Sequence, residues 1–562
     1  MTTRATTQPN QALAATTERR WPVWALLLGG AGLLLRLVFA LLPLQAHLTL
    51  LEDDAWMVAA IARNFARGGG ITADGLTPTN GFHPLYPLTL GALPYLVRPD
   101  DLVFGFSANL VICALLATAA LALFYDLARR LMRPPAALAA LAALSLNPLL
   151  IRVTVNAMET ALALLLLTLL WWYWVVRPIR DWRGAVTLGL IAALAGVARI
   201  DTLLAGVMLG LFLLGRELRQ RRFPWLSTIY AGTTALLMLP YFARNLLAFG
   251  AISPSSGRAL AYMHSYSESF TFTGFLQIMA YQPLADLSGV PTLALALGLL
   301  LLLALFATLP NQRRWQLAPL MLYALGLTFF YTFLQQDGKP RYYVGVALVI
   351  ALVVFAWLDA RLRQPRQLAL ACGTLATAIT LLNGTQFARY VTTTVSAPYL
   401  AQPAMYSAAQ WIRGNLPDDA LLAAQNSGIF QYYSGRVVLN IDGKLNNDII
   451  PVLEARGLHS YLRERQVGYV VDLPGVAQFI EFYSSDLSEA TPHLEMSSVA
   501  KLRTYAQLVL SRLGLAVAPQ LDVRQPTRVT QPFGDVATVV QQFPLPNDST
   551  QAVTVWALEG VR

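Results

Sequence analysis

The protein has 562 residues, of which 56% are hydrophobic and only 13% are charged, and its mean hydropathy is +0.50. Because soluble globular proteins carry roughly 25% charged residues, this composition excludes an ordinary soluble enzyme and predicts a membrane protein. The net charge of +10 does not indicate nucleic-acid binding, because most arginines stand in short clusters between apolar blocks, where they report membrane orientation.

The N-terminal segment combines a polar tail with an apolar run. Residues 1–20 are rich in Thr, Ala and Gln and predict a disordered cytoplasmic tail. Residues 21–44 are too long for the core of a signal peptide, and no clear small-residue cleavage site follows them. We therefore expect this run to be an uncleaved first membrane span.

About eleven apolar segments are candidates for membrane-spanning helices, which need roughly 20 residues each. They are residues 22–44, 102–126, 135–151, 160–176, 184–198, 201–215, 224–243, 290–309, 316–334, 342–358 and 367–383. The fifth and sixth are short for a full crossing, and the VARID link between them could lie within one kinked helix. The arginine pattern favours two short spans.

Arginine clusters lie before the first span and after the second, fourth, sixth, eighth and tenth. By the positive-inside rule, the N-terminus is then cytoplasmic and, with about eleven spans, the C-terminus lies outside. The outer face of the membrane receives the remaining segments, which are residues 45–101, 156–159, 199–201, 244–289, 335–341 and 384–562.

The first outer loop, residues 45–101, opens with three consecutive acids, Glu52, Asp53 and Asp54. The residues that follow, AWMVAAIARNFARGGG, have helical spacing and end in a run of glycines, so Asp53 or Asp54 could cap the N-terminus of a helix. A cap needs only one carboxylate. A second acid close to the lipid surface is better explained if a cationic or proton-donating group meets it.

The turn-rich segment after this helix contains His83, one of only five histidines. We favour a hydrogen-bonded structural imidazole over a catalytic one. No second histidine lies at ligand spacing, and both Cys113 and Cys372 lie in apolar runs. No metal site or cofactor is therefore predicted; a divalent cation could take part, but no clear ligand set supports one.

Other charged residues recur where spans meet the outer face, and each alone would be an interfacial anchor. They are Glu159 in NAMETAL, Arg199 and Asp201 in VARIDTLL, Arg244 in PYFARNLLAFG, and Lys339 and Arg341 in QQDGKPRYY. Arg199 and Asp201 could simply pair with each other. Together, the set brings carboxylates that could act as a base and cations that could hold a phosphate to one face. All three lysines, Lys339, Lys444 and Lys501, fall on this side.

The C-terminal segment changes to the pattern of a soluble protein. Residues 404–416 and 459–466 have helical spacing, and SGIFQYYSG indicates a short helix or turn. Short apolar strands are expected at ALLAAQ, RVVLNID, VGYVVDL and TVWALEGV. Strands that alternate with helices predict a small extracytoplasmic α/β domain over residues 391–562, after a transmembrane domain over residues 21–390.

The ordered set of motifs resembles a known family. The motifs are DDAWMVAAIARNFARGGG, TPTNGFHPLYPL, NAMETAL, VARIDTLL, PYFARNLLAFG, KPRYYV and NSGIFQYYSGRVVLNIDG. Together they resemble the GT-C superfamily of polytopic glycosyltransferases, in particular family 39-like bacterial members related to protein O-mannosyltransferases and the aminoarabinose transferase. The resemblance covers most of the chain in order and implies an α-helical polytopic fold of the GT-C type with the α/β domain behind it.

The resemblance also implies a reaction. A sugar would pass from a polyprenyl-phosphate donor to a hydroxyl of a glycan, lipid or protein acceptor at the extracytoplasmic face of the cell membrane. It places an acidic base in the first outer loop, a role that falls on Asp53 or Asp54; the family often has Asp-Glu where this chain has Asp-Asp. The remaining substrate-binding candidates are Glu159, Arg199, Asp201, Arg244, Lys339, Arg341, His83 and Tyr342, with Tyr343 beside it.

The chemistry is consistent with a single-displacement, inverting transfer, because a carboxylate can take the acceptor proton while the leaving phosphate is already an anion. One alternative is a transporter or flippase of a polyprenyl-linked sugar or another amphiphile, although no internal repeat of the kind common in transporters is evident. A third hypothesis is a non-catalytic membrane scaffold. It predicts that Asp53, Asp54, Glu159, Arg199 and Arg341 do not share one cavity.

Overall fold

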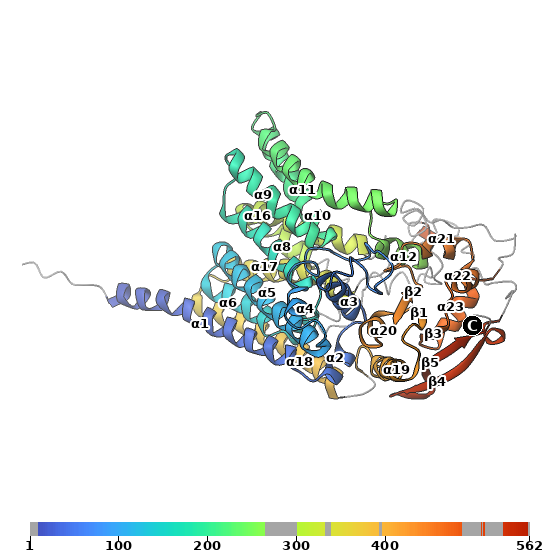
Figure 1. Ribbon diagram of the computed structural model, residues 1–562. Helices are drawn as coiled ribbons and strands as arrows, with labels where there is room; N and C mark the ends of the chain where they lie inside the picture. Colours follow the sequence, from blue (N-terminus) through green and yellow to red (C-terminus); the bar gives the residue numbers. More distant parts are fainter. Residues whose placement is uncertain are drawn as a thin grey trace, which may run out of the picture.

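The computed structural model describes residues 9–264, 301–331, 339–392, 396–485 and 532–559 and the single positions 507, 510 and 511. It consists of a helical bundle and a C-terminal domain with a five-stranded sheet, which lies at one end of the bundle (Figure 1). The bundle and its loops contain α1 (Pro9–Ala40), α2 (Leu44–Leu50), α3 (Asp54–Ala66), α4 (Leu93–Val97), α5 (Leu102–Leu131), α6 (Pro134–Ser145), α7 (Pro148–Thr154), α8 (Thr160–Val176), α9 (Trp182–Ala198), η1 (Ile200–Thr202), α10 (Leu203–Arg219), α11 (Trp225–Phe249), α12 (Ser255–His264), α16 (Asn311–Phe329), η3 (Pro340–Tyr343), α17 (Val344–Arg361) and α18 (Pro365–Thr392).

Within the described residues, five helical segments are long and apolar enough to cross a membrane: Pro22–Ala40, Leu102–Leu131, Trp225–Phe249, Pro340–Arg361 and Pro365–Thr392. Helices α6 and α7 would add a sixth if the bent pair counts as one span, and α8 and α9 are shorter apolar helices. Residues 290–300 of the expected span 290–309 lie outside the described part. The number of about eleven spans therefore stays a prediction.

One expected span differs in detail from the structure, and the link between two others is as the arginine pattern favoured. The span expected over residues 135–151 bends by 62° between α6 and α7, where Pro148 disfavours a helical conformation at the preceding residue. The side chain of Asn147 instead caps α7 by accepting from the N–H groups of Leu149 and Leu150. The VARID link separates two distinct helices, α9 and α10, because Arg199 has an extended backbone (φ −161°, ψ 118°).

The N-terminal segment is helical from Pro9 onward, which corrects the expectation of a disordered tail over residues 1–20; residues 1–8 lie outside the described part. Proline is favoured at the first position of a helix, and the QALAA run that follows has high helix propensity. The apolar span that begins at Pro22 thus continues a longer helix.

The C-terminal domain has the strand order β2-β1-β3-β5-β4. Its strands are β1 (Leu421–Ala424), β2 (Val437–Asn440), β3 (Tyr469–Asp472), β4 (Ala537–Leu545) and β5 (Asp548–Leu558). Strands β1 to β3 are parallel, as their helical crossovers require, and the hairpin β4–β5 adds antiparallel strands at one edge. The helices of the domain are α19 (Gln402–Asn415), α20 (Gly428–Tyr433), α21 (Ile449–Glu454), α22 (Leu458–Glu464) and α23 (Gly475–Phe482), and η4 (Phe533–Asp535) precedes β4.

This domain confirms the predicted α/β pattern, including the four expected strands and the short helix in SGIFQYYSG. It shares a hydrophobic core with the bundle, because Trp56 of α3 stacks on Phe106 of α5 with ring centroids 5.0 Å apart, and Phe106 also contacts Tyr432 of α20. Large aromatic side chains contribute much of the burial energy in such a core. The position of the C-terminal domain is therefore fixed directly against the first outer loop.

Candidate active site

A cavity of about 900 Å³ lies where the first outer loop, the bundle and the C-terminal domain meet. Most of the residues predicted from the sequence line it, and these are Asp54, His83, Glu159, Arg199, Asp201, Lys339, Arg341 and Tyr342. They come from α3, from the loop after it, from the N-terminal ends of α8 and α17, and from the α9–α10 turn. The shared cavity contradicts the scaffold hypothesis for four of its five test residues; Asp53 is the exception.

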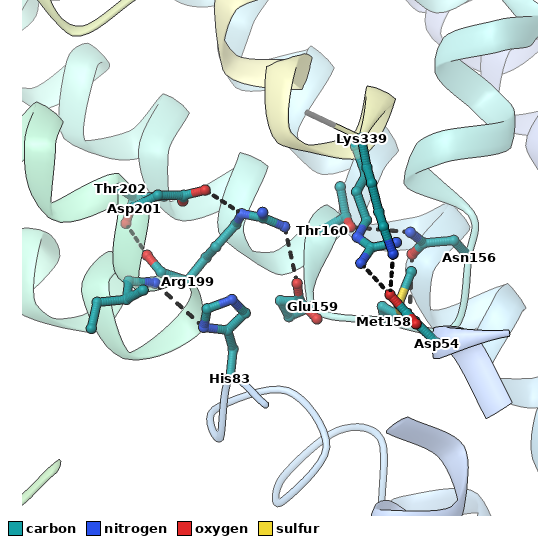
Figure 2. Close-up of polar contacts among 12 residues, drawn as sticks. Asp54, His83, Asn156, Met158, Glu159, Thr160, Arg199, Asp201, Thr202 and Lys339 are labelled. Carbon is teal, nitrogen blue, oxygen red and sulfur yellow. Dashed lines mark hydrogen bonds and ion pairs between the residues drawn. The ribbon is translucent and has the colours of Figure 1, made fainter. Parts of the chain in front are cut away.

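Asp54 lies at the charged end of the cavity. Its Oδ2 atom accepts hydrogen bonds from Lys339 Nζ at 2.7 Å and from Arg341 at 2.6 Å (Figure 2). Within the described part of the chain, its Oδ1 atom has no hydrogen-bond partner, and the side chain is 18% exposed. Burial opposes ionisation, but the charges of Lys339 and Lys444 outweigh it and lower the pKa of Asp54. The carboxylate is therefore ionised, with one oxygen available.

Glu52 supports the same cations, a role that the sequence did not assign. Its carboxylate contacts the guanidinium of Arg341 and lies 3.6 Å from Lys339 Nζ. Glu52 and Asp54 therefore share two cations across one turn at the start of α3. Because buried charges are costly unless they are paired, this arrangement lets several charged groups remain in a largely buried site.

A second charged group forms around Arg199. Its guanidinium pairs with Asp201 at 2.8 Å, as expected, and with Glu159 at 3.0 Å (Figure 2). The carboxylate of Asp201 also accepts from the hydroxyl of Tyr331 at 2.5 Å. Tyr342 stacks on Tyr331, with ring centroids 4.4 Å apart, and the Arg199 guanidinium lies 4.5 Å from the centre of the Tyr342 ring. Arg199 is thus held in one orientation by carboxylates on one side and an aromatic face on the other.

His83 makes the hydrogen bond expected of a structural imidazole and also lines the cavity. Its Nδ1 atom accepts from the Ile200 N–H at 3.4 Å, which leaves the proton on Nε2 (Figure 2). Burial lowers the pKa of His83, so the ring is neutral at pH 7. Within the described residues, no three His, Cys, Asp or Glu side chains are grouped so that they could hold a metal ion.

Arg244 and Tyr343 lie outside this arrangement. Arg244, on α11, donates to the Thr79 carbonyl at 3.2 Å, and its guanidinium lies 5.2 Å from the centre of the Phe249 ring. It does not line the cavity, so the structure places it against the first outer loop and not among the cations of the site. Tyr343 is 1% exposed in the core of the bundle and does not line the cavity, although its ring contacts Tyr331 at a centroid distance of 6.0 Å.

Asp53 points away from the cavity and binds the C-terminal domain. Its carboxylate accepts from the N–H groups of Gly428 and Ile429, both at 2.8 Å, at the start of α20. It makes no capping hydrogen bond to α3, so the expected cap of its own helix is wrong. The free N–H groups at the N-terminus of α20 receive the carboxylate instead, since they have no partner within their own helix. Burial raises the pKa of Asp53 to about 7, despite the two hydrogen bonds.

Helix α3 contacts the other end of α20 through Arg63. Its guanidinium donates to the carbonyl oxygens of Tyr432 at 3.0 Å and Gln431 at 3.4 Å. An acid therefore meets the N-terminus of α20 and a cation meets its C-terminus, which is the favourable arrangement for the helix dipole. Together with the shared aromatic core, these contacts dock the C-terminal domain on α3.

Besides Glu52, sequence reasoning did not assign three further residues that line the cavity. They are Tyr331 just after α16, Arg258 on α12, and Lys444 in the loop after β2 of the C-terminal domain. Arg258 and Lys444 belong to segments that were expected on the outer face. The sequence does show that all three lysines lie in segments expected on the outer face. Only the docking of the C-terminal domain shows that Lys444 reaches the cavity.

Comparisons with known proteins agree with this architecture. Residues 95–247 match a family model described as dolichyl-phosphate-mannose-protein mannosyltransferase, and residues 394–517 match a domain of unknown function. Among solved structures, ArnT from Cupriavidus metallidurans bound to undecaprenyl phosphate is similar at a TM-score of 0.53, with 12% identity over 96% of this chain and 98% of that one. The chain has the GT-C fold.

Another GT-C structure is similar over a smaller share of its length. The Archaeoglobus fulgidus oligosaccharyltransferase in the apo form has a TM-score of 0.51 and 14% identity, over 82% of this chain and 71% of that one. No curated protein sequence matches the chain. The expected resemblance to GT-C glycosyltransferases is confirmed, as is a multi-pass membrane protein. Glu159, Arg199 and Asp201 fall within the matched residues of the GT-C bundle.

The close contact between Asp53 and Gly428, the first residue of α20, predicts that a methyl group added at Gly428 destabilises the protein. In Gly428→Ala, the new Cβ would overlap the Asp53 carbonyl oxygen and lie 2.9 Å from its carboxylate. We expect a loss of about 1–3 kcal/mol in the free energy of unfolding, seen as a lower thermal unfolding midpoint of the detergent-solubilised protein. Gly475→Ala is the matched control, because Gly475 also begins a helix of this domain but has open space around it. Equal midpoints for the two variants would contradict the docking role of this contact.

Proposed function

We propose that the protein is a membrane glycosyltransferase that moves a sugar from a polyprenyl-phosphate donor to an acceptor hydroxyl at the extracytoplasmic face. The observation that carries this proposal is one cavity that combines a carboxylate, two cations bonded to it and an apolar wall. The GT-C fold supports it. ArnT was solved with undecaprenyl phosphate, and the archaeal oligosaccharyltransferase AglB with an inhibitory peptide and a dolichol-phosphate.

The shape of the cavity suits a lipid with a charged head group. Leu203, Leu204 and Val207 of α10 face Leu327, Phe329 and Phe330 at the end of α16, and all six line the cavity. Val207 is 53% exposed and Phe329 is 42% exposed on the outside of the bundle. The apolar wall therefore continues to a surface that would face lipid, so a polyprenyl chain could stay in the bilayer while its phosphate reaches Lys339 and Arg341.

The reaction needs one base and one site for the leaving phosphate. As the acceptor oxygen attacks the anomeric carbon, a new C–O bond forms and the bond between that carbon and the phosphate oxygen breaks. Asp54 Oδ1 takes the acceptor proton, and Lys339 and Arg341 stabilise the negative charge that grows on the departing phosphate. The two other carboxylates that line the cavity, Glu159 and Asp201, are paired with Arg199, which leaves Asp54 to act as the base and favours a single displacement with inversion.

The ion pairs of Asp54 also suit the order of binding. Lys339 and Arg341 are bonded to the carboxylate and keep it ionised. A bound phosphate would compete for the same cations and weaken their hold on Asp54. The carboxylate would then become a stronger base once the donor is in place, when its ability to accept a proton is required.

The remaining residues would orient the sugar and the acceptor. Arg199 is fixed by Glu159 and Asp201, so it can present its guanidinium to hydroxyl or phosphate oxygens without reorganising. The protonated Nε2 of His83 can donate to a hydroxyl on the same side of the cavity. The acceptor could be a glycan, lipid or protein. The arginine pattern supports a cytoplasmic N-terminus and a cavity at the extracytoplasmic face.

The two aspartates are expected to respond differently to substitution. Asp54→Asn should lower the transfer rate by about 10²–10⁴-fold, because it removes the base. Asp53→Asn should lower it far less, because Asp53 acts through the docking of the C-terminal domain. The measurement is incubation of membranes with a panel of radiolabelled polyprenyl-phosphate sugars, followed by detection of the labelled product.

If the Asp54→Asn protein transferred the sugar at the wild-type rate, Asp54 would not be the base. A wild-type protein that carries labelled lipid across vesicle membranes without forming any glycosidic bond would support the flippase alternative instead.

The pH dependence of the transfer rate should depend on the cations that lie next to Asp54. Because neighbouring cations lower the pKa of Asp54, the acid limb of kcat/KM should lie below the ordinary range of an aspartate. Lys339→Met removes one of these charges, which raises the pKa and should move the acid limb to higher pH. Lys339→Arg, which keeps the charge, is the control. The same acid limb in wild type and Lys339→Met would show that Asp54 does not carry the titration.

A further inference from the structure

The C-terminal domain reaches the cavity through the loop after β2, residues 441–447. Among the described residues of this domain, Lys444 and Leu445 line the cavity. The Lys444 side chain is 19% exposed, and its Nζ atom lies 3.0 Å from Asp442 Oδ2. Leu445 packs with Met57, Ile61 and Phe82 of the first outer loop. The loop therefore brings a cation from the C-terminal domain into a site formed mainly by the bundle.

Two other segments hold this loop in position. The Lys444 carbonyl accepts from Ser255 Oγ at 2.8 Å, and the Ser255 N–H donates to Asn80 Oδ1 at 3.1 Å. Gly81 passes so close that a Cβ atom there would overlap the Lys444 carbonyl oxygen. Only glycine permits this approach. The backbone of Lys444 is thus fixed against both the first outer loop and α12.

The charge of Lys444 acts at the same end of the cavity as Asp54. Burial and the nearby charge of Lys339 oppose protonation, but Asp442 and Asp54 outweigh them and raise the pKa of Lys444. The group is therefore a cation, and Asp442 holds its ammonium from behind. Lys339 and Arg341 thus bond directly to the Asp54 carboxylate, and Lys444 of the other domain lines the same cavity, close enough for its charge to act on Asp54.

A phosphate in this place would meet all three cations. Its oxygens need several donors once water is displaced, and a lysine ammonium can turn its three N–H groups toward a bound anion. Lys444 is balanced by Asp442, so the cation can lie at the cavity without an unpaired buried charge. The position of the loop is also held by its backbone and by Leu445, and Arg258 of α12 donates a hydrogen bond to the side chain of Asn447.

We propose that Lys444 binds the phosphate of the lipid-linked donor together with Lys339 and Arg341, so that the C-terminal domain completes the donor site. This inference rests on the proposed function and adds to it a substrate-binding residue from outside the bundle. It also gives the C-terminal domain a direct part in the reaction, since the donor site is complete only when that domain is docked on α3.

The test measures binding and transfer separately. Purified full-length protein in detergent is titrated with undecaprenyl phosphate, which carries no sugar, and with undecaprenol, which carries no phosphate. Lys444→Gln should weaken binding of undecaprenyl phosphate by about 10-fold or more, as expected for the loss of a charged hydrogen bond, and should leave binding of undecaprenol unchanged. The KM for the sugar donor should rise by a similar factor, with a smaller change in kcat.

Two further variants serve as controls. Lys444→Arg keeps the positive charge and should retain most of the affinity for undecaprenyl phosphate. Arg465→Gln removes an exposed cation of the same domain, whose side chain pairs with exposed Asp448, and should behave as wild type. Thermal unfolding midpoints show whether each variant is folded.

The proposal is overturned if Lys444→Gln binds undecaprenyl phosphate as wild type does, or if it lowers kcat alone while binding and KM stay unchanged. An equal loss of affinity for undecaprenol would also overturn it, because the effect would then concern the lipid chain. Failure of the proposed function is a different result, in which the wild-type protein itself neither binds undecaprenyl phosphate nor transfers a sugar.

Discussion

The start of helix α3 decides how the two parts of this protein work together. Successive residues of a helix point about 100° apart, so the side chains of two adjacent aspartates at its N-terminus point in different directions. Asp53 binds the N-terminus of α20 in the C-terminal domain, and Asp54 faces the cavity between two cations. The contact that docks the domain and the carboxylate proposed as the base are therefore neighbours in the chain. A shift of one would move the other.

The charged groups of the cavity form pairs of opposite charge, which lowers the free-energy cost of burying them. Arg199 is held by Glu159 and Asp201, and Lys339 and Arg341 are held by Glu52 and Asp54. Such pairs contribute little net stability, because desolvation offsets most of the attraction. Their value lies in orientation, since fixed charges stabilise a developing charge without having to reorganise. The anionic donor proposed for this site would take over cations that are now paired with carboxylates.

The C-terminal domain appears in this arrangement as part of the site and not as a separate module. It shares an aromatic core with α3 and α5, and it is bound at both ends of α20 by charged residues of α3. Its loop after β2 is fixed by close backbone contacts with the first outer loop and α12. These contacts involve residues far apart in the sequence, so they couple the folding of the domain to the assembly of the cavity.

The sequence by itself determined the class of protein, the α/β pattern of the C-terminal segment and most of the candidate site. Composition requires burial in lipid, strand and helix periods are local properties, and the ordered motifs mark where spans meet the outer face. Only the tertiary structure decided that Asp54 and not Asp53 faces the cavity, that Arg244 supports a loop, and that Lys444 joins the cations. The physical reason is that the direction of a side chain and the docking of a domain depend on packing between distant segments, which local sequence patterns do not encode.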